Sequence, residues 1–175
     1  MIFATYYWRL ELARLARLLR RHMRQRRWRA ASDASVEKCV MLGCYAVRKM
    51  LHAFQPPPNM PTDVPLTTFP HNGKKLSRIV WPSVEDAFDL AKPGGERISL
   101  RELSNQVIHS HFFSLWLGPD RALRGIFFCS DRNKDRKVYR LHMVALVTLF
   151  EQIASSRRRA ASLAHLYPDH NRVTM

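Results

Sequence analysis

The sequence predicts a mainly α-helical domain, a helical bundle in which one β-hairpin is inserted before the last long helix. Apolar residues recur at helical spacing in four stretches: 5–30, 34–54, 98–117 and 142–160. The clearest strand pattern lies in residues 123–141, where two apolar runs flank a charged turn. We therefore expect four or five helices to form the core, with the hairpin lying against them.

The composition indicates one globular domain with a strongly basic surface. The chain has 175 residues, 46% of them hydrophobic, which is enough to bury a core. Its formal charge is +15, from 29 Lys and Arg against 14 Asp and Glu. Such a charge favours RNA or another polyanion as a partner. A basic surface without a specific polyanion is the alternative.

The cysteines indicate the cellular compartment of the protein, and the absence of sequence motifs bears on whether it binds a cofactor. The three cysteines are odd in number and lack CxxC spacing, which predicts reduced thiols and a cytoplasmic location. No metal-ligand spacing, Walker loop or dinucleotide fingerprint occurs, so we expect no metal and no cofactor. The N-terminal apolar run ends before Arg9. It is too short for a signal peptide or a membrane-spanning helix, so we expect no integral membrane association.

Residues 1–31 form the first expected unit, a basic amphipathic helix. It precedes a helical domain at 32–160 and a tail at 161–175 that is expected to be flexible. Nine arginines of the first unit stand against the single acid Glu11. The helix is interpreted either as an arm that contacts phosphates or anionic lipid, or as a packed helix whose arginines face water. Its apolar stripe consists of Trp8, Leu12, Leu15, Leu19 and Met23.

A second helix is expected at 34–54, with Ser32 and Asp33 as candidate N-caps. Arg48 on this helix pairs with a buried carboxylate, pairs with the polar residues of the next long helix, or extends to solvent. The core face of the second helix is expected to consist of Val36, Val40, Val47, Leu51 and Phe54.

The next segment, 55–75, holds six prolines and little periodicity, which predicts a loop. A short extended piece is expected at Leu76–Val80. Ser83 and Asp86 then predict a capped short helix at 83–91.

The domain is expected to be organised around Ile98–Leu117. Ser99 and Glu102 fit a capping box at its start, and Gly118-Pro119 would stop a helix at its end. The stretch between is apolar almost all round, which predicts a single, largely buried helix.

Three polar residues of this stretch are the candidate catalytic residues. Arg101, Asn105 and His109 recur every fourth residue, so they share one side of a helix. Histidine can exchange a proton near neutral pH, and arginine can hold a phosphate. With asparagine as an orienting group, they would support metal-independent RNA cleavage by attack of the 2′-hydroxyl. The alternative is a buried structural network of Asn105 and His109.

The hairpin is expected to pair Leu123–Ser130 with Lys137–Leu141 across the charged turn Asp131–Arg136, and a helix at 142–160 follows it. Basic residues of the first two helices and of this turn are the candidate nucleic-acid ligands. They are Arg20, Arg21, Arg24, Arg26, Arg27, Arg48, Arg132, Lys134 and Arg136.

Three blocks carry a resemblance: YAVRKMLHA at 45–53, SLRELSNQVIHSHFF at 99–113 and GIFFCSDRNKDRKVYRL at 125–141. Over residues 34–155 the chain resembles a family of uncharacterised bacterial proteins with an Arg-Lys helix and an Asn-x-x-x-His helix. More distantly it is similar to HEPN-type helical bundles, many of which are RNases. The HEPN motif places four to six residues between its Arg and His, whereas seven separate Arg101 from His109.

Two functions are therefore expected from the sequence. The first is a nucleic-acid-associated, HEPN-like protein that is a candidate RNase. The second is a noncatalytic helical protein that acts by binding a protein partner or by forming a homodimer.

Overall fold

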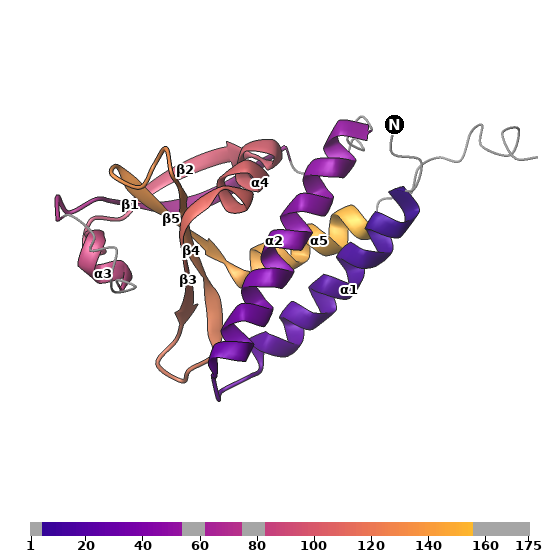
Figure 1. Cartoon of the computed structure of the whole chain (residues 1–175), viewed down its shortest axis with the longest axis horizontal. Coiled ribbons are helices and arrows are strands. Elements are labelled where there is room, and N and C mark those ends of the chain that lie inside the picture. The colour runs from indigo at the N-terminus through magenta and orange to yellow at the C-terminus, as the bar shows by residue number, and fades with distance from the viewer. Residues whose placement is uncertain (1–4, 54–61, 75–82, 156–175) are drawn as a thin grey trace, which may run out of the picture.

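The computed structural model describes residues 5–53, 62–74 and 83–155 and shows a mixed α/β fold (Figure 1). Five strands form one antiparallel sheet, so the predicted mainly α-helical bundle, HEPN-like or otherwise, is wrong. In chain order the elements are α1 Thr5–Met23, α2 Ala30–Ala53, β1 Asp63–Pro70, α3 Val84–Ala87, β2 Gly94–Ser99, α4 Leu100–Ile108, β3 Ser110–Leu117, β4 Leu123–Ser130, β5 Lys137–His142 and α5 Met143–Ser155.

The predicted hairpin is present as β4 and β5, with Ile126 opposite Leu141 and Phe128 opposite Tyr139. It lies within a larger sheet whose strand order is β2-β1-β5-β4-β3. β5 pairs with β1 on its other side, so a strand from the first half of the chain joins the hairpin. β3 and β2 are the two end strands of this sheet.

The stretch Ile98–Leu117 is not one helix. Ser99 accepts a hydrogen bond from the backbone N–H of Glu102 at 3.2 Å, so the predicted helix start is correct, but α4 ends at Ile108. From Ser110 onward the chain pairs with β4 as strand β3. The apolar run of Ser110–Leu117 fits a strand as well as it fits a helix, because periodicity alone does not separate the two over so short a stretch.

The proline-rich stretch also contains a strand that the sequence did not predict. Val64 and Leu66 of β1 point into the main core, whereas Phe69 packs on the opposite face. β1 pairs with β2 over Asp63–Thr68 but with β5 only over Thr67–Pro70. The prolines at 65 and 70 therefore each lie where β1 has one paired neighbour, which limits the cost of the missing N–H.

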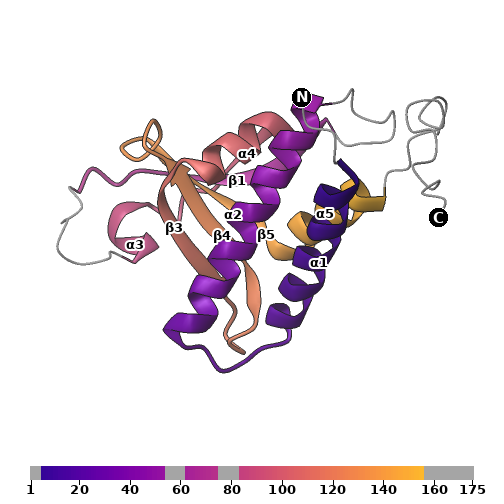
Figure 2. The ribbon, with the colours of Figure 1, turned by 45° about the vertical axis from the view of Figure 1, so that its right-hand side comes forward.

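Alternate residues of the central strands supply two apolar cores. Ile126 and Phe128 of β4 face α1, α2, α4 and α5, which cover one side of the sheet (Figure 2). Phe127 and Cys129 face the other side, where they pack with residues of α3. Burial on both faces explains why β4 lacks the polar alternation of a half-exposed strand.

The first helix packs on the body of the protein, between α2 and α5. The side chains of Leu12, Leu15 and Leu19 are each at most 1% exposed. Arg20 donates two hydrogen bonds of 2.6 Å to the carboxylate of Glu151 on α5. The predicted apolar stripe is thus a packing face, and the arginines lie on the remaining sides of the helix.

Smaller predictions have mixed outcomes. The carboxylate of Asp86 accepts a hydrogen bond from the backbone N–H of Ser83 at 2.8 Å, which confirms the predicted cap. The second helix begins at Ala30, so Ser32 and Asp33 lie inside its first turn. Other predicted segments lie outside the described residues: Phe54 with the loop to residue 61, Leu76–Val80, 156–160 and the tail at 161–175.

Candidate nucleic-acid interface

The predicted catalytic residues lie along α4 and at its end. Arg101 is exposed in the first turn, Asn105 is half-buried, and His109 is exposed at the C-cap. The backbone N–H of His109 donates to the carbonyl of Asn105 at 3.0 Å, which keeps the two residues on one side. The predicted side-by-side placement of Asn105 and His109 is therefore present, although α4, with nine residues, is about half as long as the predicted helix.

Arg48 of α2 lies beside these polar residues and contacts His109. Its Nη1 lies 3.4 Å from His109 Nε2. Because a guanidinium can only donate, Nε2 must be the acceptor, which places the imidazole proton on Nδ1. An oxyanion between the two side chains would accept hydrogen bonds from the guanidinium and from a protonated imidazole. A neutral His109 could take a proton at Nε2 once the guanidinium turns from Nε2 to the oxyanion. Asn105 Oδ1 is buried and has no hydrogen-bond partner among the described residues.

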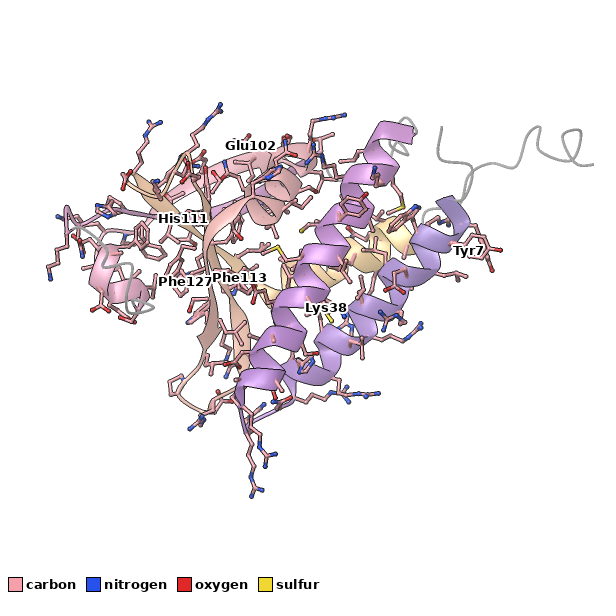
Figure 3. All side chains as sticks on the ribbon, viewed as in Figure 1. Tyr7, Lys38, Glu102, His111, Phe113 and Phe127 are labelled. Carbon is pink, nitrogen blue, oxygen red and sulfur yellow. The ribbon has the colours of Figure 1, made fainter. Side chains whose placement is uncertain are left out.

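The predicted nucleic-acid ligands fall into separate regions. Arg20, Arg21, Arg24, Arg26 and Arg27 lie at the end of α1 and in the connection to α2, where many nitrogen-tipped side chains project (Figure 3). Arg132, Lys134 and Arg136 lie in the β4–β5 turn, at the opposite end of the molecule in Figures 1 and 2. Arg48 is in neither group, because it lies beside His109.

Several of these cations are neutralised within the fold. Arg20 is paired with Glu151 and lowers the pKa of that carboxyl group by hydrogen bonding. Arg26 lies 3.4 Å from Asp120, and Lys134 lies 2.8 Å from Asp131. Within the described ranges, the exposed arginines of the first segment that have no carboxylate partner are Arg17, Arg21, Arg24, Arg27 and Arg29.

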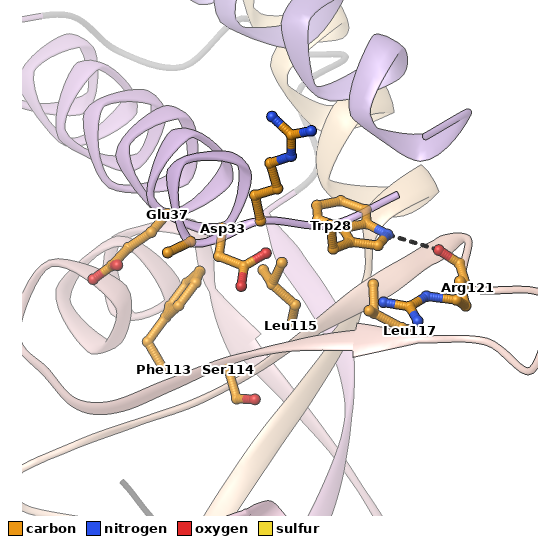
Figure 4. Close-up of a pocket in the computed structure, with 10 residues that line it drawn as sticks. Trp28, Asp33, Glu37, Phe113, Ser114, Leu115, Leu117 and Arg121 are labelled. Carbon is orange, nitrogen blue, oxygen red and sulfur yellow. Dashed lines mark hydrogen bonds between the residues drawn. The ribbon is translucent and has the colours of Figure 1, made fainter. Parts of the chain in front are cut away.

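Sequence reasoning missed a cavity of about 500 Å³ between the start of α2 and strand β3 (Figure 4). Its apolar floor is formed by Phe113, Leu115 and Leu117. At one end Trp28 Nε1 donates to the carbonyl of Arg121 at 2.8 Å. No local signal reveals this cavity, because it depends on β3 being the end strand of the sheet.

The cysteines contribute no reactive thiolate to these regions. Cys39, Cys44 and Cys129 are buried free thiols. Burial raises the pKa of Cys44 and Cys129 to about 12, so both stay protonated at neutral pH. Among the described residues, no group of three His, Cys, Asp or Glu side chains could hold a metal ion. No helix in those ranges is long and apolar enough to cross a bilayer.

Comparison with known proteins gives no relative. No protein-family model matches the chain, and neither does any curated protein or solved structure. The resemblance to bacterial Arg-Lys and Asn-x-x-x-His proteins stays a prediction from the residues that carry it.

Proposed function

We propose that this protein binds RNA or another nucleic acid through the surface formed by the end of α1 and the α1–α2 connection. The observation that carries the proposal is the group of five exposed arginines that no carboxylate of the described chain neutralises: Arg17, Arg21, Arg24, Arg27 and Arg29. A cation that is already paired would have to give up its partner to bind phosphate, whereas these arginines would not. The net charge of +15 adds long-range attraction to any polyanion. A reducing, cytoplasmic location accords with the buried free thiols.

Replacing three unpaired arginines, as R21Q/R24Q/R27Q, should weaken binding to a 20-nucleotide single-stranded RNA. Each lost phosphate contact lowers the slope of log affinity against log salt by roughly 0.7, so the slope should fall by roughly 2. Fluorescence anisotropy over a series of salt concentrations measures both quantities.

The matched control is R14Q/R20Q/R124Q, which removes the same charge from arginines that are paired with Glu11, Glu151 and Asp120. We expect it to keep most of the salt slope, and thermal melting checks that both triple variants are folded. Equal losses in the two variants would mean that net charge alone attracts RNA. Absence of RNA binding by the native protein at low salt would contradict the proposal directly.

A second candidate function is metal-independent RNA cleavage at His109. It is favoured by the exposure of His109 and by the guanidinium of Arg48 at 3.4 Å, which together offer a proton acceptor and a phosphate ligand. H109A should lower the rate of RNA cleavage in EDTA by about a hundredfold or more. Because His109 is exposed, the melting temperature should hardly change.

The control is H111A, since His111 is also exposed and lies near the acidic Asp131, at 3.7 Å. Cleavage that H109A and H111A affect equally, or the absence of cleavage by the native protein, would remove this second candidate. RNA binding at the α1–α2 connection would be unaffected by that outcome.

A further inference from the structure

Within the described residues, the outer edge of β3 is not paired with another strand. β3 lies at the end of the sheet and pairs only with β4 among the described strands, so its outward N–H and C=O groups have no strand partner. Protein sheets usually protect such an edge with proline, lysine or a bulge. The register irregularities of β3 are confined to its ends, and Phe112–Trp116 pairs without interruption and contains neither proline nor lysine.

Beside this edge, half-buried apolar side chains face the cavity under α2. Phe113, Leu115 and Leu117 project toward the helices and form its floor, whereas Ser114 points away from α2 (Figure 4). A polypeptide that pairs with β3 would place every second side chain in this cavity, because side chains alternate along a strand. A helix laid on the edge would leave the open N–H and C=O groups unpaired.

Charge distinguishes one part of the cavity. Asp33 and Glu37, one turn apart on α2, lie over Phe113 and Leu115, and neither has an ion pair in the described chain (Figure 4). Arg29 and Arg121 adjoin Trp28 at the other end. In a protein of charge +15, two unpaired carboxylates above an apolar floor favour a basic side chain with a long apolar stem.

We propose that an extended segment of a partner protein adds to β3 as a sixth strand of the sheet. Apolar side chains of this segment would fill the cavity, and one Lys or Arg would reach Asp33 and Glu37. Addition of a strand at a sheet edge is an established mode of peptide recognition, in which the main chain supplies affinity and alternate pockets supply specificity. This docking function does not depend on nucleic-acid binding. The two proposed surfaces adjoin at Arg29, which lines the cavity, whereas the other four arginines of the nucleic-acid surface do not.

A second copy of the chain fits this edge less well than a basic peptide. Isologous pairing of β3 with itself would place the Asp33 and Glu37 carboxylates of both copies along the same interface. It would also bring together two chains that each carry a charge of +15.

The test uses fluorescein-labelled eight-residue peptides and the full-length protein. In each peptide Thr and Val alternate along the chain. One central position is varied and is Lys, Thr or Glu. We expect the Lys peptide to bind about tenfold more tightly than the Glu peptide, and D33K/E37K to reverse this preference. The matched variant E85K/D135K changes the charge equally at exposed sites elsewhere and should keep the original preference.

A second arm tests the main-chain pairing. In the Lys peptide, the amide nitrogens of every second residue face β3, and those of the residues between them face away. Methylating the first set of amide nitrogens should therefore abolish binding, whereas methylating the second set should be tolerated. Binding that survives both methylation patterns would overturn strand addition. So would a charge preference that D33K/E37K leaves unchanged, or no peptide binding at all. Sedimentation that shows a dimer disrupted by D33K/E37K would assign the edge to a second copy and overturn the partner peptide.

Discussion

Replacing Gly125 with alanine is expected to destabilise the protein by about 3 kcal/mol or more. A Cβ at this position would lie 2.2 Å from the carbonyl oxygen of Leu141 and 2.9 Å from the ring of Trp116. Gly125 pairs with Trp116 on one side and with His142 on the other, so β4 cannot move away from one clash without worsening the other. Insertion of atoms into a well-packed site costs about 1–3 kcal/mol, and a clash with backbone belongs at the upper end or beyond.

Urea unfolding followed by far-UV circular dichroism measures this loss. The control is G95A, which makes the same substitution within strand β2. There an added Cβ would meet no atom of the described residues within 4 Å, apart from those of its chain neighbours. We expect the free energy of unfolding of G95A to stay within about 0.5 kcal/mol of the native value. Equal stability of the two variants would show that the backbones of β4 and β5 leave room for a Cβ at Gly125.

The hairpin was predictable because its information is local. Lys137–Leu141 alternates apolar and charged residues, and the charged turn from Asp131 to Arg136 separates it from an apolar run. Whether Ser110–Leu117 forms a helix or a strand does not depend on local sequence alone. Its apolar residues satisfy a buried helix and a buried strand equally, and pairing with β4 decides between them. The pattern of residues within one segment does not indicate which later segment will pair with it.

The candidate sites follow the same division. The neighbouring positions of Asn105 and His109 were predictable because both belong to one short helix and its C-cap. Contact of Arg48 with the polar residues of that helix was one of three alternatives left open by the sequence. The cavity between α2 and β3 was not predictable, because Asp33 and Phe113 are brought together only by the order of strands in the sheet. Local residue spacing therefore identified the cationic groups but missed the surface that combines carboxylates with an open strand edge.

Replacing Leu15 with alanine is expected to cost about 3 kcal/mol, within the range of 2–5 kcal/mol measured for large-to-small changes in cores. Leu15 is 1% exposed and belongs to the core that α1 shares with α2 and α5. For the same reason, deletion of residues 1–31 would not isolate their role in RNA binding. Such a deletion would remove three buried leucines, Leu12, Leu15 and Leu19, together with the arginines.

The matched control is L10A on the same helix, because Leu10 is 49% exposed and the substitution is chemically identical. We expect L10A to change the free energy of unfolding by less than about 0.5 kcal/mol in the same urea titration. If L15A were as stable as L10A, the first helix would behave as a detached arm, and its apolar stripe would need another binding partner. A large loss in L15A alone would place α1 within the cooperative fold. The position of its unpaired arginines would then be fixed by the packing of Leu12, Leu15 and Leu19.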